Sequence, residues 1–249
     1  MLFRSDYKKI WDTIPVSNAV NQLVGTGGAG PSGTAGVNLP NEDLYKQKYG
    51  TKSIIVANIT QSAREIFSDI GMNEFLEYKH EINKAKKSIA IRGPIMVTLH
   101  EIVGHGSGKI ITKEDPHITL REFYSTLEEA RAELCALHHI WDLEMQKIGV
   151  VPDNDCCESA YLGYALSDLT LLRMLENEDE IHEDHLRATH LIVQYLMHEK
   201  KCIEFYKSRD PQKAGKTFVR VTDYQLMREG VAELRFGAGA LNRYSTICV

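Results

Sequence analysis

The segment TLHEIVGHGSGK, Thr98–Lys109, is the most informative stretch of the sequence for the fold and the site. It contains His100, Glu101 directly after it, and His105 five residues after the first histidine. Neutral imidazole nitrogens are preferred zinc ligands, and a glutamate beside one of them can accept a proton from a metal-activated water. The segment therefore predicts a metal centre.

The spacing of the two histidines requires a distorted helix. In a regular α-helix, residues four apart are separated by about 400° and share a face, whereas residues five apart are separated by about 500° and diverge by about 140°. Both imidazoles can bind one metal ion only if the helix absorbs an extra residue, as a π-helical turn does. We expect such a turn between His100 and His105, with Gly104 best able to accommodate it.

A carboxylate ligand is expected from a second helical segment, TLEEARAEL, Thr126–Leu134. Glu129 and Glu133 are four residues apart and share a helical face, and Glu128 is turned away by about 100°. A site of two histidines and one glutamate suits catalytic zinc, and further acids can hold the imidazoles through their second ring nitrogens. Acidic helix faces are common, so this pattern carries weight only together with the first.

The chain is predicted to be mainly α-helical, with a few short strands near the N-terminal third. A first helix is expected at residues 6–23, followed by the glycine- and proline-rich segment Gly25–Asp43 and a strand-like run at Ser53–Ile59. Helical periodicity then covers residues 61–69, 73–87, 94–105, 120–147, 158–176, 180–207 and 223–243. The expected division is an N-terminal helix in 1–24, a glycine-rich segment with short strands in 25–60, and a helical domain in 61–249.

Composition excludes several classes of protein. The net charge of −5 is spread over interspersed acids and bases, so a nucleic-acid partner is not expected. No run approaches the roughly 20 apolar residues of a membrane helix, and residues 1–11 lack the apolar core of a secretory signal. The five cysteines have no metal-binding spacing, and the chain is too large to need disulfides. We expect a cytoplasmic protein.

Two weaker motifs are set aside. Gly25–Gly30 spells GxGxxG, but Pro31–Gly33 follows where a dinucleotide-binding loop needs a helix to begin. Gly108–Lys109 is similar to the end of a phosphate-binding loop, but Val103 occupies the position of the required first glycine.

HEIVGH followed by EEARAE closely resembles the paired HExxGH and EExxRAE/D motifs of dipeptidyl peptidase III, the M49 family of zinc exopeptidases. The flanking GHGSGK and STLEE, and NLPN at Asn38–Asn41, agree with that family, and the similarity extends from about Gly30 to about Leu226. The resemblance implies a helical zinc-peptidase catalytic lobe that holds one Zn²⁺ per chain. It also implies an enzyme that removes dipeptides from the N-terminus of short peptides.

The resemblance implies a role for each candidate residue. His100, His105 and Glu129 would bind zinc, and Glu101 would be the catalytic proton acceptor. The supporting residues would be Glu128 and Glu133, which hold the imidazoles, and Asn38 and Asn41, which contact the substrate backbone.

A histidine on a later helix steadies the oxyanion in the family, and EDHLRATHL offers two candidates. His185 fits the family pattern better than His190. Thr189 stands where the family usually has an arginine for the peptide carboxylate, although Arg187 is close.

Family members are considerably longer than this chain and close two lobes around a peptide. The chain is therefore expected to be a truncated form in which a missing lobe or a second chain completes the cleft, and 25–60 would belong to the opposite lobe. Two alternatives stay open: a non-catalytic zinc-binding helical module derived from the family, and a helical protein without metal.

Overall fold

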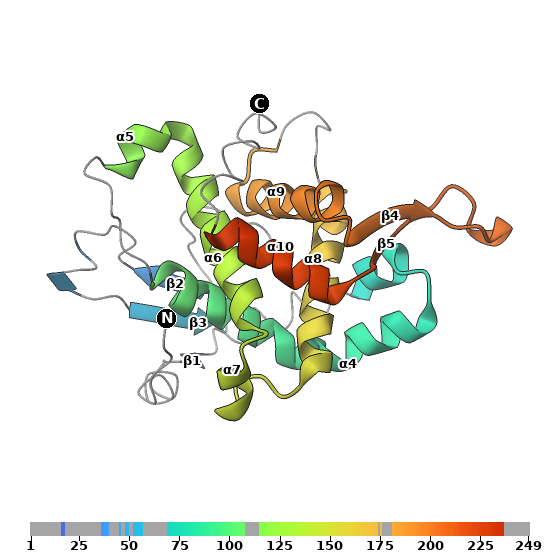
Figure 1. Ribbon diagram of the computed structural model, residues 1–249, viewed down its shortest axis with the longest axis horizontal. Coiled ribbons are helices and arrows are strands. Elements are labelled where there is room, and N and C mark those ends of the chain that lie inside the picture. The colour runs from blue at the N-terminus through green and yellow to red at the C-terminus, as the bar shows by residue number, and fades with distance from the viewer. Residues whose placement is uncertain are drawn as a thin grey trace.

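A computed structural model describes residues 16–17, 36–39, 45, 48–49, 52–56, 69–107, 115–173, 175 and 181–236. The chain is mainly helical, as the sequence predicts (Figure 1). The helices are α4 (Lys79–Thr98), η1 (Leu99–His105), α5 (Pro116–Leu120), η2 (Arg121–Phe123), α6 (Tyr124–His139), α7 (Leu143–Lys147), α8 (Asn154–Leu172), α9 (Asp184–His198), η3 (Pro211–Lys213) and α10 (Tyr224–Phe236).

A small sheet lies in the N-terminal third, where short strands are expected. Its strands are β1 (Val16–Ser17), β2 (Gly36–Leu39) and β3 (Lys52–Val56), in the order β1-β3-β2. β3 pairs parallel with β1 and antiparallel with β2. The predicted helix at 6–23 is wrong at Val16–Ser17, which pair with β3 instead, and Pro15 interrupts the helical pattern directly before them. The rest of that predicted helix lies outside the described residues, as does the segment 25–35.

A second sheet contradicts part of the helix predicted for 180–207. α9 ends at His198, and residues 203–207 form strand β4 (Ile203–Lys207), which pairs antiparallel with β5 (Thr217–Val221). The chain turns at Lys201, whose φ of 56° is unusual for a residue with a side chain. No glycine or proline marks this turn, so the sequence pattern missed it.

Pro94 does not separate two helices as the sequence suggests. α4 runs through it, and the Thr98 hydroxyl donates a hydrogen bond of 2.7 Å to the Pro94 carbonyl. The proline removes one backbone donor, but the packing of α4 along α8 holds the helix together on both sides of it. Conversely, the predicted helix 120–147 is divided into α6 and α7 by Asp142, whose side chain caps α7.

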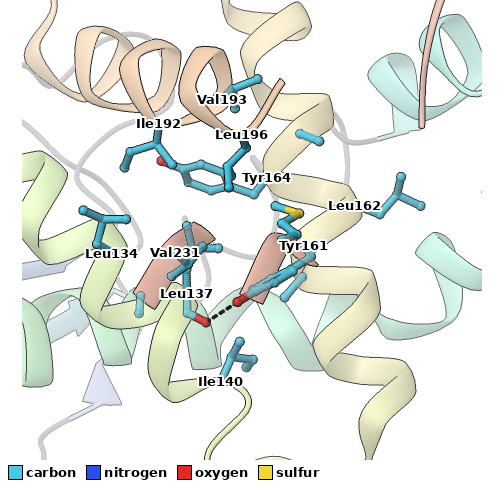
Figure 2. Packing of buried hydrophobic residues seen from close by; sticks show 14 of the residues in the cluster. Leu134, Leu137, Ile140, Tyr161, Leu162, Tyr164, Ile192, Val193, Leu196 and Val231 are labelled. Atoms are coloured by element: carbon cyan, nitrogen blue, oxygen red, sulfur yellow. Dashed lines mark hydrogen bonds between the residues drawn. The ribbon is translucent and has the colours of Figure 1, made fainter. Parts of the chain in front are cut away.

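The core lies where α6, α8, α9 and α10 meet (Figure 2). Leu137 of α6, Leu196 of α9 and Val231 of α10 are fully buried around Tyr161 and its neighbours on α8. The Tyr161 hydroxyl is satisfied because it donates to the Leu137 carbonyl at 3.1 Å. This core fixes α6 and α9 relative to each other, and both helices carry site residues.

Four cysteines in the described part of the chain are buried free thiols: Cys135, Cys156, Cys157 and Cys202. Burial raises the pKa of Cys156 to about 11 and that of Cys157 to about 12. Among the described residues, no helix is both long enough and apolar enough to cross a membrane.

Candidate metal centre

The segment that carries the two histidines has the wide turn that their spacing requires. Residues Leu99–His105 form the π-helix η1, which continues directly from α4. The Gly106 amide closes its last turn by donating to the carbonyl of Glu101 at 3.0 Å, five residues back. The rings of His100 and His105 consequently lie together, with centroids 4.7 Å apart. The predicted π-helical turn is confirmed.

Gly104 is important for packing rather than for backbone freedom. A Cβ atom at Gly104 would lie 2.8 Å from the Cα and 3.0 Å from the carbonyl oxygen of Ala132 on α6. Contacts that short essentially do not occur, so η1 can approach α6 this closely only because residue 104 has no side chain. The close approach brings the two histidines to the glutamates of α6.

The two imidazoles converge on one carboxylate oxygen. Glu129 Oε2 lies 3.2 Å from Nε2 of His100 and 3.4 Å from Nε2 of His105. This oxygen is buried and accepts no hydrogen bond of ordinary geometry, which is costly for a carboxylate. The His100, His105 and Glu129 ligand atoms all lie within 4.8 Å of one another. A divalent cation at their centre would satisfy all three, so this donor set fits a metal ion.

The other ring nitrogen of each histidine faces a second carboxylate. His100 Nδ1 lies 3.4 Å from Glu133, and His105 Nδ1 lies 3.1 Å from Glu128. Carboxylates in this position fix the ring and leave Nε2 to face the metal, as in many zinc proteins. Glu128 and Glu133 thus lie beside the two imidazoles, and their role in holding the rings for a metal stays a prediction.

Arg131 is a site residue that the sequence interpretation did not single out. Its guanidinium donates to both oxygens of Glu128, at 2.7 and 2.5 Å, and to the carbonyl of Ser107 at 3.2 Å. It therefore holds the partner of His105 and also the chain just beyond η1. The available signal was its position inside EEARAE, three residues after Glu128, where helical side chains meet.

The histidines and glutamates of this cluster shift one another's pKa values. Burial alone would lower the pKa of His100, but the Glu133 and Glu129 carboxylates outweigh it and raise that pKa to about 10. Burial would raise the pKa of Glu128, but Arg131 and His105 lower it to about 2. For Glu129, contacts with the histidines likewise overcome burial and hold the pKa well below its ordinary value. The two imidazoles and three carboxylates thus stabilise one another's charged forms.

Glu101 stands apart from these carboxylates because no salt bridge or hydrogen bond of its side chain is found among the described residues. Burial raises its pKa, and the nearby positive charges of His100 and His105 only partly oppose that change. A raised pKa makes this carboxylate a better proton acceptor than an ordinary surface glutamate.

Of the two candidate histidines on α9, the structure brings His185 to the cluster. Its Nε2 lies 3.1 Å from Glu129 Oε2, and its ring stacks on His100 with centroids 5.9 Å apart. His190 instead contacts the buried carboxylate of Asp168 on α8, at 3.1 Å from Nδ1. His185 is not in the set of mutually close ligand atoms formed by His100, His105 and Glu129, so it borders the candidate metal position.

The candidate substrate residues are only partly placed. Asn38 lies in β2, where it pairs with Ser53 of β3, and β2 packs near η1. Asn41 lies outside the described residues. Arg187 donates to the carbonyl of Ile181, and Thr189 is buried.

Comparison with known proteins supports the family that the motifs suggest. The model of peptidase family M49 matches residues 26–121, which include η1. Dipeptidyl peptidase 3 of Homo sapiens is 33% identical over 90 residues, and that of Nematostella vectensis is 33% identical over 88. Each match covers 35% of this chain and only 11% of the relative, so the matched region spans about a tenth of the relatives' length.

Solved structures extend the similarity over most of the fold. Dipeptidyl peptidase III from Caldithrix abyssi matches 87% of this chain and 40% of its own, with a TM-score of 0.65 and 22% identity. The enzyme from Corallococcus sp. strain EGB matches 87% of this chain and 39% of its own, with a TM-score of 0.60 and 18% identity. The sequence matches support the dipeptidyl peptidase III family, peptidase family M49, and the solved structures show that the fold is shared.

Proposed function

We propose that this chain is the zinc-binding catalytic lobe of a peptidase that removes dipeptides from the N-terminus of short peptides. The observation that supports this most strongly is the buried Glu129 Oε2, which lies between Nε2 of His100 and Nε2 of His105 without a hydrogen bond. Two imidazoles and one carboxylate form the ligand set that catalytic zinc uses when one position is left for water. One Zn²⁺ per chain is the proposed cofactor.

A zinc ion held by these residues would polarise the scissile carbonyl and lower the pKa of the attacking water. Glu101 accepts the proton of that water, a role favoured by the burial that raises its pKa. His185 offers Nε2 at the edge of the cluster, where it can donate a hydrogen bond to the oxyanion that forms as the water attacks. Asn38 and Asn41 are proposed to bind the peptide backbone.

The chain spans a minor part of its relatives, so its own activity is a separate part of the proposal. We propose that residues 25–60 belong to a lobe opposite the helical domain 61–249, and that further protein, in this chain's full form or in a partner, completes the peptide cleft. The cytoplasm is the proposed location, consistent with four buried free thiols.

The test measures zinc content and hydrolysis of a dipeptidyl-arylamide on the same sample. The wild-type chain should hold one zinc ion and release dipeptide. Glu101→Gln should hold the same zinc and lose the hydrolysis. Glu229→Gln, which changes an exposed glutamate on α10, is the matched control and should behave as wild type.

The same experiment separates the alternatives. Zinc at one per chain with no hydrolysis would favour a non-catalytic zinc-binding module, a reading favoured by the 11% coverage of the relatives. A chain that binds no zinc would contradict both readings. Loss of zinc in Glu101→Gln would show that Glu101 is a ligand, against the proposed role.

A further inference from the structure

The side-chain N-caps of the described helices are mostly of one residue type, and the N-cap of α9 differs. Where a helix of the described residues is capped by a side chain, that side chain is an aspartate in every case but one. The aspartates are Asp115, Asp142, Asp153, Asp210 and Asp223. α9 alone begins at a glutamate, Glu183. Glutamate is not a favoured N-cap residue, so its use here calls for a reason beyond capping.

The two carboxylate oxygens of Glu183 make different contacts. Oε2 accepts a hydrogen bond from the Leu186 amide at 2.7 Å, which is the capping interaction. Oε1 lies 2.7 Å from Nδ1 of His185. An aspartate is one methylene shorter, so it could cap the helix but could not also reach the imidazole. The additional length of glutamate is therefore used on His185.

This contact determines which nitrogen of His185 faces the metal position. With Nδ1 facing Glu183 Oε1, Nε2 points toward Glu129 Oε2, 3.1 Å away. The start of α9 is itself fixed against α6, because the Thr126 hydroxyl donates to Asp184 at 2.6 Å. Since His185 is half exposed, packing alone does not fix its ring.

We propose that Glu183 is a positioning residue that holds the His185 ring with Nδ1 toward Glu183 and Nε2 directed at the proposed metal position. The N-cap of α9 thereby serves the reaction as well as the helix. The catalytic part of this inference rests on the proposed peptidase function, but the placement of the ring does not.

The test is Glu183→Asp, which keeps a favoured cap and removes the reach to His185. Ring ¹⁵N NMR of the zinc-loaded protein reports the Nδ1 signal of His185 and the exchange of its proton, and thermal unfolding reports the helix. We expect Glu183→Asp to unfold within a few degrees of wild type, with a shifted, fast-exchanging Nδ1–H signal. For the dipeptidyl-arylamide, kcat should fall about 10- to 100-fold with little change in KM.

Asp153→Ala is the matched control, because it removes the cap of α8 away from the metal centre. It should lower the unfolding temperature and leave the His185 signals as in wild type. Unchanged ring signals in Glu183→Asp would overturn the proposal, whatever happens to kcat. If the wild-type chain has no peptidase activity, the proposed function fails, while the ring signals still decide the role of Glu183.

Discussion

Glu129 Oε2 is the single atom on which both histidines of η1 converge, so losing either imidazole should have a large effect on metal binding. We predict that His105→Ala loses most of the zinc, because the two remaining ligands cannot hold a catalytic site. Metal analysis by mass spectrometry gives the stoichiometry. His198→Ala on the exposed end of α9 should keep full zinc and serves as the control. Unchanged zinc in His105→Ala would remove the basis of the assigned ligand set.

Arg131 acts on the same site through Glu128 and Ser107. We predict that Arg131→Lys binds zinc about 10- to 100-fold more weakly, because a single ammonium cannot replace a planar guanidinium that makes three directed contacts. Competition with a chelator measures the affinity. Arg220→Lys provides the control, since Arg220 also makes two contacts to one glutamate, but on the β4–β5 hairpin. Equal zinc affinity in wild type and Arg131→Lys would mean that Arg131 is dispensable for the site.

Among the elements, the contact between η1 and α6 brings together the residues of the candidate metal centre. We predict that Gly104→Ala weakens zinc binding and lowers stability by about 1–3 kcal/mol, because its Cβ would collide with the backbone of Ala132 and push the histidines from the glutamates. Denaturant unfolding and zinc affinity are measured together. Gly230→Ala, which would crowd Leu196 and Lys200 between α10 and α9, should lower stability without changing zinc affinity. If Gly104→Ala also keeps the wild-type zinc affinity, the site does not require a residue without a side chain at position 104.

The sequence predicts elements well where one physical requirement dominates. The five-residue spacing of His100 and His105 requires a π-helical turn for a shared metal, and η1 has it. Turns without glycine or proline are harder to predict: the chain reverses at Lys201 and forms β4–β5, stabilised by cross-strand pairs that no local pattern reports. The contact of Arg131 with Ser107 is also not predictable from a local pattern, because it depends on how η1 packs against α6.

At the scale of the whole molecule, acid should destabilise the fold through His139 at the end of α6. Burial first, and then the charge of Arg235, lower the pKa of His139 to about 4. The unfolded chain takes up a proton near the ordinary pKa of 6.5, and the folded chain resists it until about pH 4. Stability from this group is therefore fully present above pH 6.5 and is lost as the pH falls toward 4.

The measurable consequence is a difference between variants. We predict that lowering the pH from 7.5 to 5 removes on the order of 1–2 kcal/mol of stability through His139, and that His139→Gln removes this part of the pH dependence. Denaturant unfolding at both pH values measures it, with His198→Gln as the control on exposed α9 surface. Identical pH dependence in wild type and His139→Gln would show that other groups cause the acid effect.

The share of its relatives that the chain spans bears on the proposed peptidase activity. Catalysis depends on holding the peptide against the reacting water, and the chain matches 40% of a related enzyme. We predict that this chain, at matched zinc occupancy, hydrolyses a dipeptidyl-arylamide far more slowly than a full-length relative. Comparable kcat/KM values would mean that the helical domain and residues 25–60 suffice for positioning.

The buried thiols can report how often individual elements of the fold open locally. A protonated thiol reacts poorly with alkylating reagents, and burial raises the pKa of Cys156, Cys157 and Cys202. Each cysteine can be labelled only when its own element separates from the core. The labelling rates of the Cys156–Cys157 pair and of Cys202 therefore measure, independently, how often α8 and the start of the β4–β5 hairpin open in the native state.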